Sequence, residues 1–118
     1  MILLLVLALA APSIGPTLAA PPAEDTALYV KWCARCHGEA GDGKGPAAAA
    51  LAFNGAPPRD FTAGRLKLGT VKEGGAPTDA DLARVIAGGV PGTSMPWFSD
   101  LLSADEIARL GGVVRSFA

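Results

Sequence analysis

The chain has 118 residues and a formal net charge of −1, and half of its residues are apolar. This length predicts a single domain, and a domain of this size buries only about 60–65% of the surface of its unfolded chain. Any bound cofactor would therefore form a large part of the core. The near-neutral charge argues against nucleic acid or an anionic membrane surface as a partner.

The first segment has the pattern of an export signal. An uninterrupted apolar run extends from Ile2 to Ala11, and small residues at Thr17 and Ala19 suit cleavage after Ala19. The run is well short of the roughly 20 apolar residues that span a bilayer. We expect a signal peptide over residues 1–19, a mature domain over residues 20–118 and a periplasmic location. An uncleaved membrane anchor is the alternative.

The first part of the mature chain combines one helix with a glycine-rich loop. Helix signals begin at Glu24, and Leu28 and Trp32 then fall on one face. The stretch Gly38–Gly45 carries too many glycines for a regular element. Pro46, which is tolerated at a first helical position, is expected to open a short alanine-rich turn.

Two further helices are predicted in the second half of the chain. Thr78 is the expected N-cap of the first, which ends at Gly88–Gly89. The second begins at Ser103, which forms a capping box with Glu106. The pair Gly111–Gly112 inside it costs about 1 kcal/mol per residue unless another backbone comes close there. Since no segment alternates like a strand, the expected class is all-α, with three or four short helices and long loops.

One motif points directly to a chemistry. Residues 33–37 read Cys-Ala-Arg-Cys-His, which matches the attachment pattern of c-type haem. Each thiol can add across one vinyl group of the haem, and His37 is then held beneath the iron. Cys33, Cys36 and His37 are also the only cysteines and the only histidine in the chain.

These residues have three alternative interpretations. A simple disulfide between Cys33 and Cys36 would close a strained four-residue loop. A zinc site would lack a fourth ligand. The serious alternative is a thioredoxin-like site, because Trp32-Cys33-x-x-Cys36 resembles that signature too. It would require a strand before the motif and a long helix after it.

The second axial ligand of a haem would have to be a methionine. Bis-histidine ligation is impossible within a chain that has a single histidine. If Met1 is removed with the signal, Met95 is the only methionine left, and it lies in a proline-flanked loop, Gly92–Trp97. His/Met ligation by His37 and Met95 is thus expected. An ordinary core methionine is the alternative.

Together these residues resemble a class I cytochrome c of the small bacterial type, including the cytochrome c domains of terminal oxidase subunits. The resemblance covers about residues 24–118. Its pieces are, in order, Leu28-Tyr29, the haem motif with Gly38, Gly43-Lys44-Gly45-Pro46, Pro58-Arg59-Asp60-Phe61, the Thr78 helix, Gly92–Pro96 and the terminal helix. It implies the cytochrome c fold, with helices and long loops wrapped around one covalently bound haem c.

The resemblance also implies a role for Pro46, whose carbonyl would accept a hydrogen bond from the axial histidine and fix its ring. Arg59 is a candidate partner for the haem propionates, with Arg65 and Lys67 as weaker candidates.

The terminal helices depart from the family pattern. That pattern has a glycine where Asp25 stands and an aromatic residue where Val113 stands, whereas here the small residues are Gly111 and Gly112. We therefore expect a different contact where these helices cross.

An iron held by both His37 and Met95 has no open position, which suits an electron carrier with a raised potential and not an enzyme. The expected partners are redox proteins, such as a membrane respiratory complex, an oxidase or a dehydrogenase. Two alternatives stay open. A labile Met95 bond would allow a peroxidase or gas sensor, and the domain could instead be permanently docked in an oxidase or dehydrogenase complex.

Overall fold

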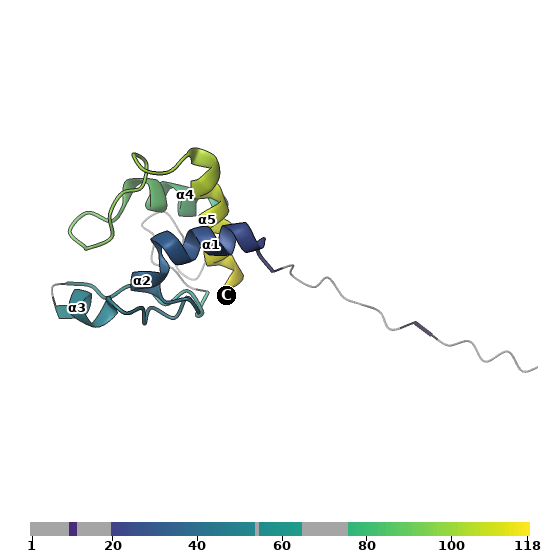
Figure 1. Ribbon diagram of the computed structural model, residues 1–118, viewed down its shortest axis with the longest axis horizontal. Helices are drawn as coiled ribbons and strands as arrows, with labels where there is room; N and C mark the ends of the chain where they lie inside the picture. The colour runs from purple at the N-terminus through teal and green to yellow at the C-terminus, as the bar shows by residue number, and fades with distance from the viewer. Residues whose placement is uncertain (1–9, 12–19, 54, 65–75) are drawn as a thin grey trace, which may run out of the picture.

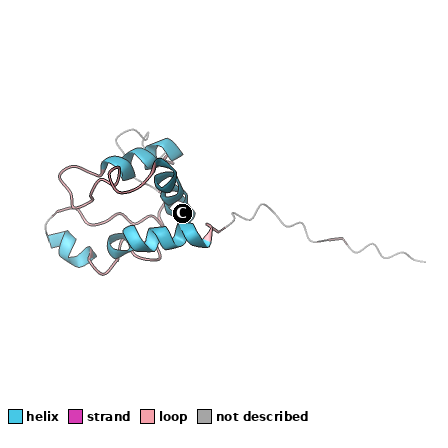
Figure 2. Cartoon of the chain, turned by 45° about the horizontal axis from the view of Figure 1, so that its top comes forward, coloured by secondary structure: helices cyan, strands magenta, loops and turns pink. Residues whose placement is uncertain are grey.

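The computed structural model describes residues 10–11, 20–53, 55–64 and 76–118. Within these ranges the secondary structure is helical, and no strand occurs in them (Figures 1 and 2). The helices are α1 (Ala23–Trp32), α2 (Ala34–His37), α3 (Ala48–Phe53), α4 (Asp79–Gly88) and α5 (Ala104–Ser116). The sequence predicted three or four helices. The count differs because α1 and α2 are separated only by Cys33, where the helix bends into a single further turn.

The predicted capping box of α5 is present, and the predicted N-cap of α4, Thr78, forms a second one. The Thr78 hydroxyl accepts a hydrogen bond from the backbone N–H of Asp81, whose carboxylate accepts one from the N–H of Thr78. Ser103 and Glu106 make the same reciprocal pair, with both distances 3.1 Å. Each box satisfies backbone donors that a helix start leaves free. The predicted starts of α4 and α5 are confirmed, as is the end of α4 at Gly89.

Helices α1 and α5 cross near the centre of the molecule (Figure 1). Nε of Arg109 lies 2.6 Å from Oδ1 of Asp25, and the Asp25 side chain is largely buried. Further along the crossing, the rings of Tyr29 and Phe117 lie 5.1 Å apart. The contact that replaces the family's glycine and aromatic residue is therefore an ion pair, supported by an aromatic pair.

The two glycines of α5 take no part in that crossing. A Cβ at Gly111 would meet Leu82 of α4 at 3.5 Å, which is an ordinary contact. Gly112 is exposed, and a Cβ there would meet nothing within 4 Å. No neighbouring backbone thus requires either glycine.

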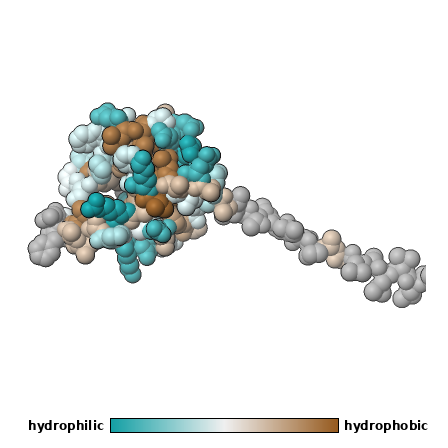
Figure 3. Space-filling view, in the orientation of Figure 1, coloured by the Kyte–Doolittle hydropathy of each residue, from teal (hydrophilic) through white to brown (hydrophobic). Residues whose placement is uncertain are grey.

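The buried core is small and lies where α1, α4 and α5 meet. Leu110 and Val113 of α5 and Tyr29 of α1 are its most enclosed large side chains. Apolar surface also shows between hydrophilic side chains on the face drawn in Figure 3. The helices alone therefore leave apolar area uncovered.

Some expectations concern parts of the chain outside the described residues. These parts are positions 1–9 and 12–19 of the expected signal peptide, and the segment that contains Arg65 and Lys67. Among the helices that are described, none has the length and apolarity needed to cross a membrane.

Replacing Gly112 by alanine tests the account of α5. Gly112→Ala should raise the free energy of unfolding by about 0.5–1 kcal/mol, because alanine restricts the unfolded chain and favours the helix. Gly45→Ala is the contrasting variant, since its Cβ would collide with the carbonyl oxygens of Ala34 and Arg35. Urea unfolding measures both. Equal destabilisation by the two variants would contradict the open environment of Gly112.

Candidate haem site

The Cys-x-x-Cys-His motif occupies the junction between α1 and α2. The N–H of Cys33 donates to the carbonyl of Tyr29 at 2.8 Å, and the N–H of His37 donates to the carbonyl of Cys33 at 2.9 Å. This single helical turn brings residues three and four apart in sequence close together. Cys33 and Cys36 are both free thiols and half-buried. The disulfide reading therefore does not describe this structure.

The glycine-rich loop folds back under α2. N–H groups of Gly43, Gly45 and Ala47 donate to the carbonyls of His37, Cys36 and Arg35, at 2.8, 3.1 and 2.9 Å respectively. These bonds satisfy acceptors that a helix end would otherwise leave free. The orientation of the motif is thus set by backbone bonds along its whole length.

Close approach by other parts of the chain requires glycine at positions 41 and 45 of this loop, among others. A Cβ at Gly41, whose φ is +68°, would lie 2.5 Å from the Phe117 ring. A Cβ at Gly45 would collide with the backbone of α2. Glycine is therefore needed in the predicted loop because the loop packs closely against α2 and the end of α5, and not only because it turns.

Tyr29 ties this loop to the core. Its side chain is fully buried, and its hydroxyl donates to the carbonyl of Gly38 at 2.8 Å. Burial raises the pKa of Tyr29, with the charges of Cys33 and Asp42 adding to the effect. The phenol therefore stays protonated and remains a donor to the residue that follows His37.

The imidazole of His37 is held on two sides. Its Nδ1 lies 3.1 Å from the carbonyl oxygen of Arg59, and its ring stacks on Phe61 with centroids 4.4 Å apart. Burial lowers the pKa of His37, and the bond to the Arg59 carbonyl opposes this effect. The neutral imidazole, which is the metal-binding form, is favoured.

The carbonyl beside His37 belongs to Arg59, whereas the family resemblance pointed to Pro46. Pro46 is exposed and is not among the described residues that line the cavity below. Arg59 takes this place because the N–H of Phe61 donates to the carbonyl of Gly41 at 2.7 Å, which holds residues 58–61 against the loop. Sequence reasoning selected Arg59 for its side chain. A backbone carbonyl leaves no signal in a sequence, so this second role could not be read there.

Met95 is held in a tight turn after α4. The hydroxyl of Thr93 donates to the carbonyl of Val90 at 2.7 Å and accepts from the N–H of Met95 at 3.2 Å. The N–H of Val90 donates in turn to the carbonyl of Met95. The thioether is half-buried and packs against the core.

Cys33, Cys36, His37 and Met95 line one cavity of about 320 Å³, together with Arg59. Its lining residues belong to all five helices, to segment 56–61 and to the loop that follows α4. Its apolar lining includes Trp32, Leu51, Phe61, Leu82, Val85, Ile86, Val90 and Phe98. A mostly apolar cavity with a few convergent polar groups is typical of a cofactor site. Two thiols, an imidazole and a thioether are the groups that a covalently attached haem requires, so the residues fit this cofactor.

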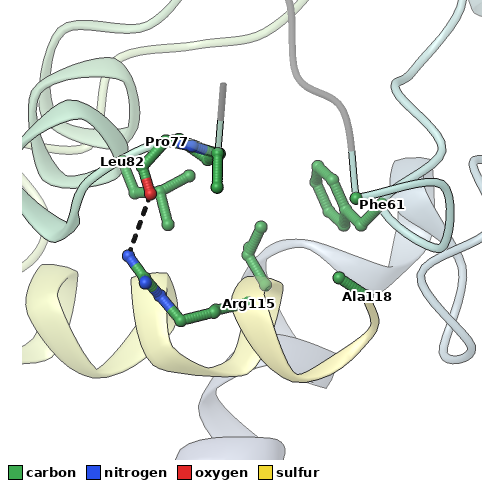
Figure 4. Close-up of a pocket in the computed structure, with 8 residues that line it drawn as sticks. Phe61, Pro77, Leu82, Arg115 and Ala118 are labelled. Carbon is green, nitrogen blue, oxygen red and sulfur yellow. Dashed lines mark hydrogen bonds between the residues drawn. The ribbon is translucent and has the colours of Figure 1, made fainter. Parts of the chain in front are cut away.

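A second, much smaller cavity of about 70 Å³ lies beside Phe61 (Figure 4). Pro77, Leu82 and Ala118 are among its lining residues, and Arg115 donates a hydrogen bond to the carbonyl of Pro77 at 3.1 Å. The polar atoms of Arg115 are thus engaged with the backbone and, at 2.7 Å, with Asp79. This space is a packing gap behind the ring that supports His37.

The surroundings of the motif do not suit thiol redox chemistry. A helix, α1, precedes the motif where a strand would be required, and a glycine loop follows the four-residue α2. Burial raises the pKa of Cys33 to about 12, and the neighbouring Cys36 adds to this shift. Reactive cysteines have lowered pKa values, because the thiolate is the nucleophile. The thioredoxin-like reading is therefore disfavoured.

Comparison with known proteins decides the family. The family model described as "Cytochrome C oxidase, cbb3-type, subunit III" matches residues 20–112. The chain belongs to this cytochrome c family. No match is found among curated protein sequences.

Two solved structures are similar to this cytochrome. One is a chain of the Kuenenia stuttgartiensis reducing HAO-like protein complex Kustc0457/Kustc0458, with 37% identity and a TM-score of 0.75. The match covers 82% of this chain and 42% of that chain, so the cytochrome spans less than half of its length. The other is the KustC0563 c-type cytochrome, with 26% identity, a TM-score of 0.50 and coverage of 79% and 95%. The predicted all-α cytochrome c fold is confirmed.

Removing the Tyr29 hydroxyl tests whether its hydrogen bond to Gly38 stabilises the loop that follows the motif. Tyr29→Phe keeps the ring against Phe117 but loses the bond to Gly38, and should lower the free energy of unfolding by about 1 kcal/mol. Ser99→Ala, which removes an exposed hydroxyl that makes none of the described hydrogen bonds, is the control and should change it by less than about 0.5 kcal/mol. Urea unfolding of the three proteins gives the comparison. A Tyr29→Phe effect no larger than the control would show that this bond does not stabilise the loop.

Proposed function

We propose that this cytochrome is a periplasmic electron-transfer protein with one haem c. Cys33 and Cys36 attach the haem, and His37 and Met95 are its axial ligands. The observation that carries the proposal is that these four side chains line the same cavity, although Met95 is distant from the motif in sequence. Haem iron supplies the one-electron exchange between its ferric and ferrous states.

The chain's own residues determine how the site would work. The Arg59 carbonyl engages Nδ1 of His37, which leaves Nε2 as the nitrogen available to a metal. The Thr93 hydrogen bonds hold the Met95 backbone in a fixed turn. The apolar lining excludes water and disfavours extra positive charge on the iron, so the potential is raised. The Arg59 side chain can offset a propionate. With both axial positions occupied, we propose no enzymatic activity.

A second candidate is a haem subunit that is permanently docked in a larger complex. The similarity to a chain of the Kuenenia complex supports it, because this cytochrome corresponds to 42% of that longer chain. Affinity capture from native membranes distinguishes the two, since a permanent subunit retains its partners through size-exclusion chromatography. In both cases we propose that residues 1–19 direct export.

The mass of the intact protein tests attachment and export together. Expression in a host with a periplasmic haem-attachment system should give residues 20–118 plus one haem after denaturation. Cys33→Ala/Cys36→Ala should carry no covalent haem, because both thioether bonds are lost. A wild-type protein that lacks haem and is two hydrogens lighter than its dithiol form would contain a Cys33–Cys36 disulfide. This result would overturn the proposal and support the thioredoxin-like alternative. A mass that includes residues 1–19 would instead show an uncleaved N-terminus.

Replacing Met95 tests the second ligand. Met95→Ala should abolish the near-infrared charge-transfer band of a methionine-ligated ferric haem. It should also lower the potential by a sizeable part of the roughly 0.8 V range that axial ligands span. Ser94→Ala, at the neighbouring cavity position, should keep the band and the potential. Spectroscopy and redox titration measure these changes. A Met95→Ala protein with an unchanged spectrum would exclude this methionine as the ligand.

A further inference from the structure

Two aromatic rings connect His37 with the end of α5. The Phe61 ring stacks on the imidazole, with an angle of 21° between the two planes. The Phe117 ring stacks in turn on Phe61, with centroids 6.3 Å apart and planes 18° apart. The same Phe117 ring packs against Tyr29 of α1. Phe117 is therefore linked to the imidazole through a single intervening ring.

Phe117 also touches the backbone that supplies the second support of His37. Its ring lies so close to Gly41 that a Cβ there would meet it at 2.5 Å. The carbonyl of Gly41 accepts a hydrogen bond from the N–H of Phe61 at 2.7 Å. That bond holds the Arg59 carbonyl beside Nδ1 of His37. Both contacts of the imidazole, the stacked ring and the carbonyl, thus depend on residues that Phe117 touches.

The rest of the fold does not enclose Phe61. Its side chain is half-buried, and it borders both the haem cavity and the cavity of about 70 Å³ (Figure 4). A ring beside empty space has fewer neighbours to fix its position, because packing contacts are lost on that side. The orientation of Phe61 therefore depends on the Phe117 ring.

The place of Phe117 along α5 explains this reach. The family's aromatic position is occupied here by Val113, whose side chain is buried. Phe117 follows four residues later, so its ring lies about 6 Å further along the helix. From this place it contacts Gly41 and Phe61 as well as Tyr29 at the helix crossing.

We propose that Phe117 is a positioning residue for the axial histidine. Its ring holds Phe61 in the stack and the Arg59 carbonyl in place, so that the plane of the imidazole and its Nδ1 hydrogen bond are both fixed. This inference rests on the proposed function, in which His37 binds the haem iron. A hydrogen bond from Nδ1–H to a carbonyl raises the basicity of a metal-bound imidazole and so favours ferric iron. Loss of the Phe117 ring should therefore raise the reduction potential.

Redox titration of the haem-loaded protein measures this effect. Phe117→Leu keeps an apolar side chain but removes the ring, and should shift the ferric/ferrous equilibrium about 2- to 10-fold toward the ferrous form. Phe117→Tyr restores the ring and should bring the equilibrium back to within about 2-fold of the wild type. A Phe117→Leu equilibrium equal to that of the wild type would overturn the proposal.

A matched control separates positioning from a general loss of stability. Val113→Ala truncates a buried side chain of the same helix that is not among the described lining residues of either cavity. It should lower the midpoint of urea unfolding, because it leaves a gap in the core, and should leave the ferric/ferrous equilibrium unchanged. Equal shifts of the equilibrium in Phe117→Leu and Val113→Ala would contradict a specific role for Phe117.

The ferric haem gives a second reading that stability alone does not change. The paramagnetic NMR shifts of its methyl groups depend on the plane of the axial imidazole. Phe117→Leu should therefore change their pattern, whereas Val113→Ala should keep it. In the ferrous protein, the Nδ1–H proton of His37 should exchange with solvent faster in Phe117→Leu than in the wild type. An unchanged pattern together with an unchanged exchange rate would exclude the proposed role.

A measurement on the wild type tests the proposal even if Phe117→Leu does not fold. In the haem-loaded ferrous protein, nuclear Overhauser effects should join the ring protons of Phe61 to those of His37 and to those of Phe117. Absence of the Phe61–Phe117 signals would show that the two rings do not stack in the loaded protein, which would overturn the inference. The outcomes also separate the two proposals. A protein that carries haem by mass but does not respond to the loss of the Phe117 ring keeps the proposed function and loses this inference, whereas a haem-free protein overturns both.

Discussion

Tyr29 joins three parts of the molecule at one buried point, and the site depends on this junction. Its ring packs against Phe117 at the end of α5, while its hydroxyl holds the carbonyl of Gly38. The crossing of α1 and α5 is thereby coupled to the loop that follows His37. The ion pair between Asp25 and Arg109 fixes the other end of the same crossing. The packing of the terminal helices and the position of the axial histidine are therefore parts of one arrangement.

The cavity is the second determinant of the structure, because the protein core is small on its own. Aromatic residues make up only 6% of the chain. Several of the apolar residues that do occur, among them Ile86 and Phe98, line the cavity as well as the buried core. An apolar cofactor that fills this space would bury further apolar area and complete the core. Stability and function thus depend on the same side chains, as is expected of a domain too small to be stabilised by its helices alone.

Local signals explain how much of this arrangement could be predicted. Thr78 and Ser103 set helix starts through bonds to residues three positions away, so the signal lies within one turn of sequence. The Cys-x-x-Cys-His motif is equally local. Contacts between residues far apart in the sequence could not be predicted in this way. Arg109 meets Asp25 only because α1 and α5 cross, and Arg59 offers its carbonyl to His37 only because Phe61 is bonded to Gly41. The glycines of α5 suggested a close helix contact, yet Gly112 faces open space.

The distribution of charge bears on whether the cytochrome is a shuttle or a permanent subunit. Permanent interfaces are large and apolar, and charged residues are depleted at their centres. Lys31 and Arg35 are exposed, line the cavity and make none of the described ion pairs, although the charge of Lys31 acts on Glu106. Burying them in a permanent contact would require an acidic partner group for each, because unpaired buried charges are costly. In a short-lived encounter the same charges stay hydrated and act through their long-range field. Exposed cations of this kind therefore suit the proposed free electron carrier better than the proposed permanent subunit.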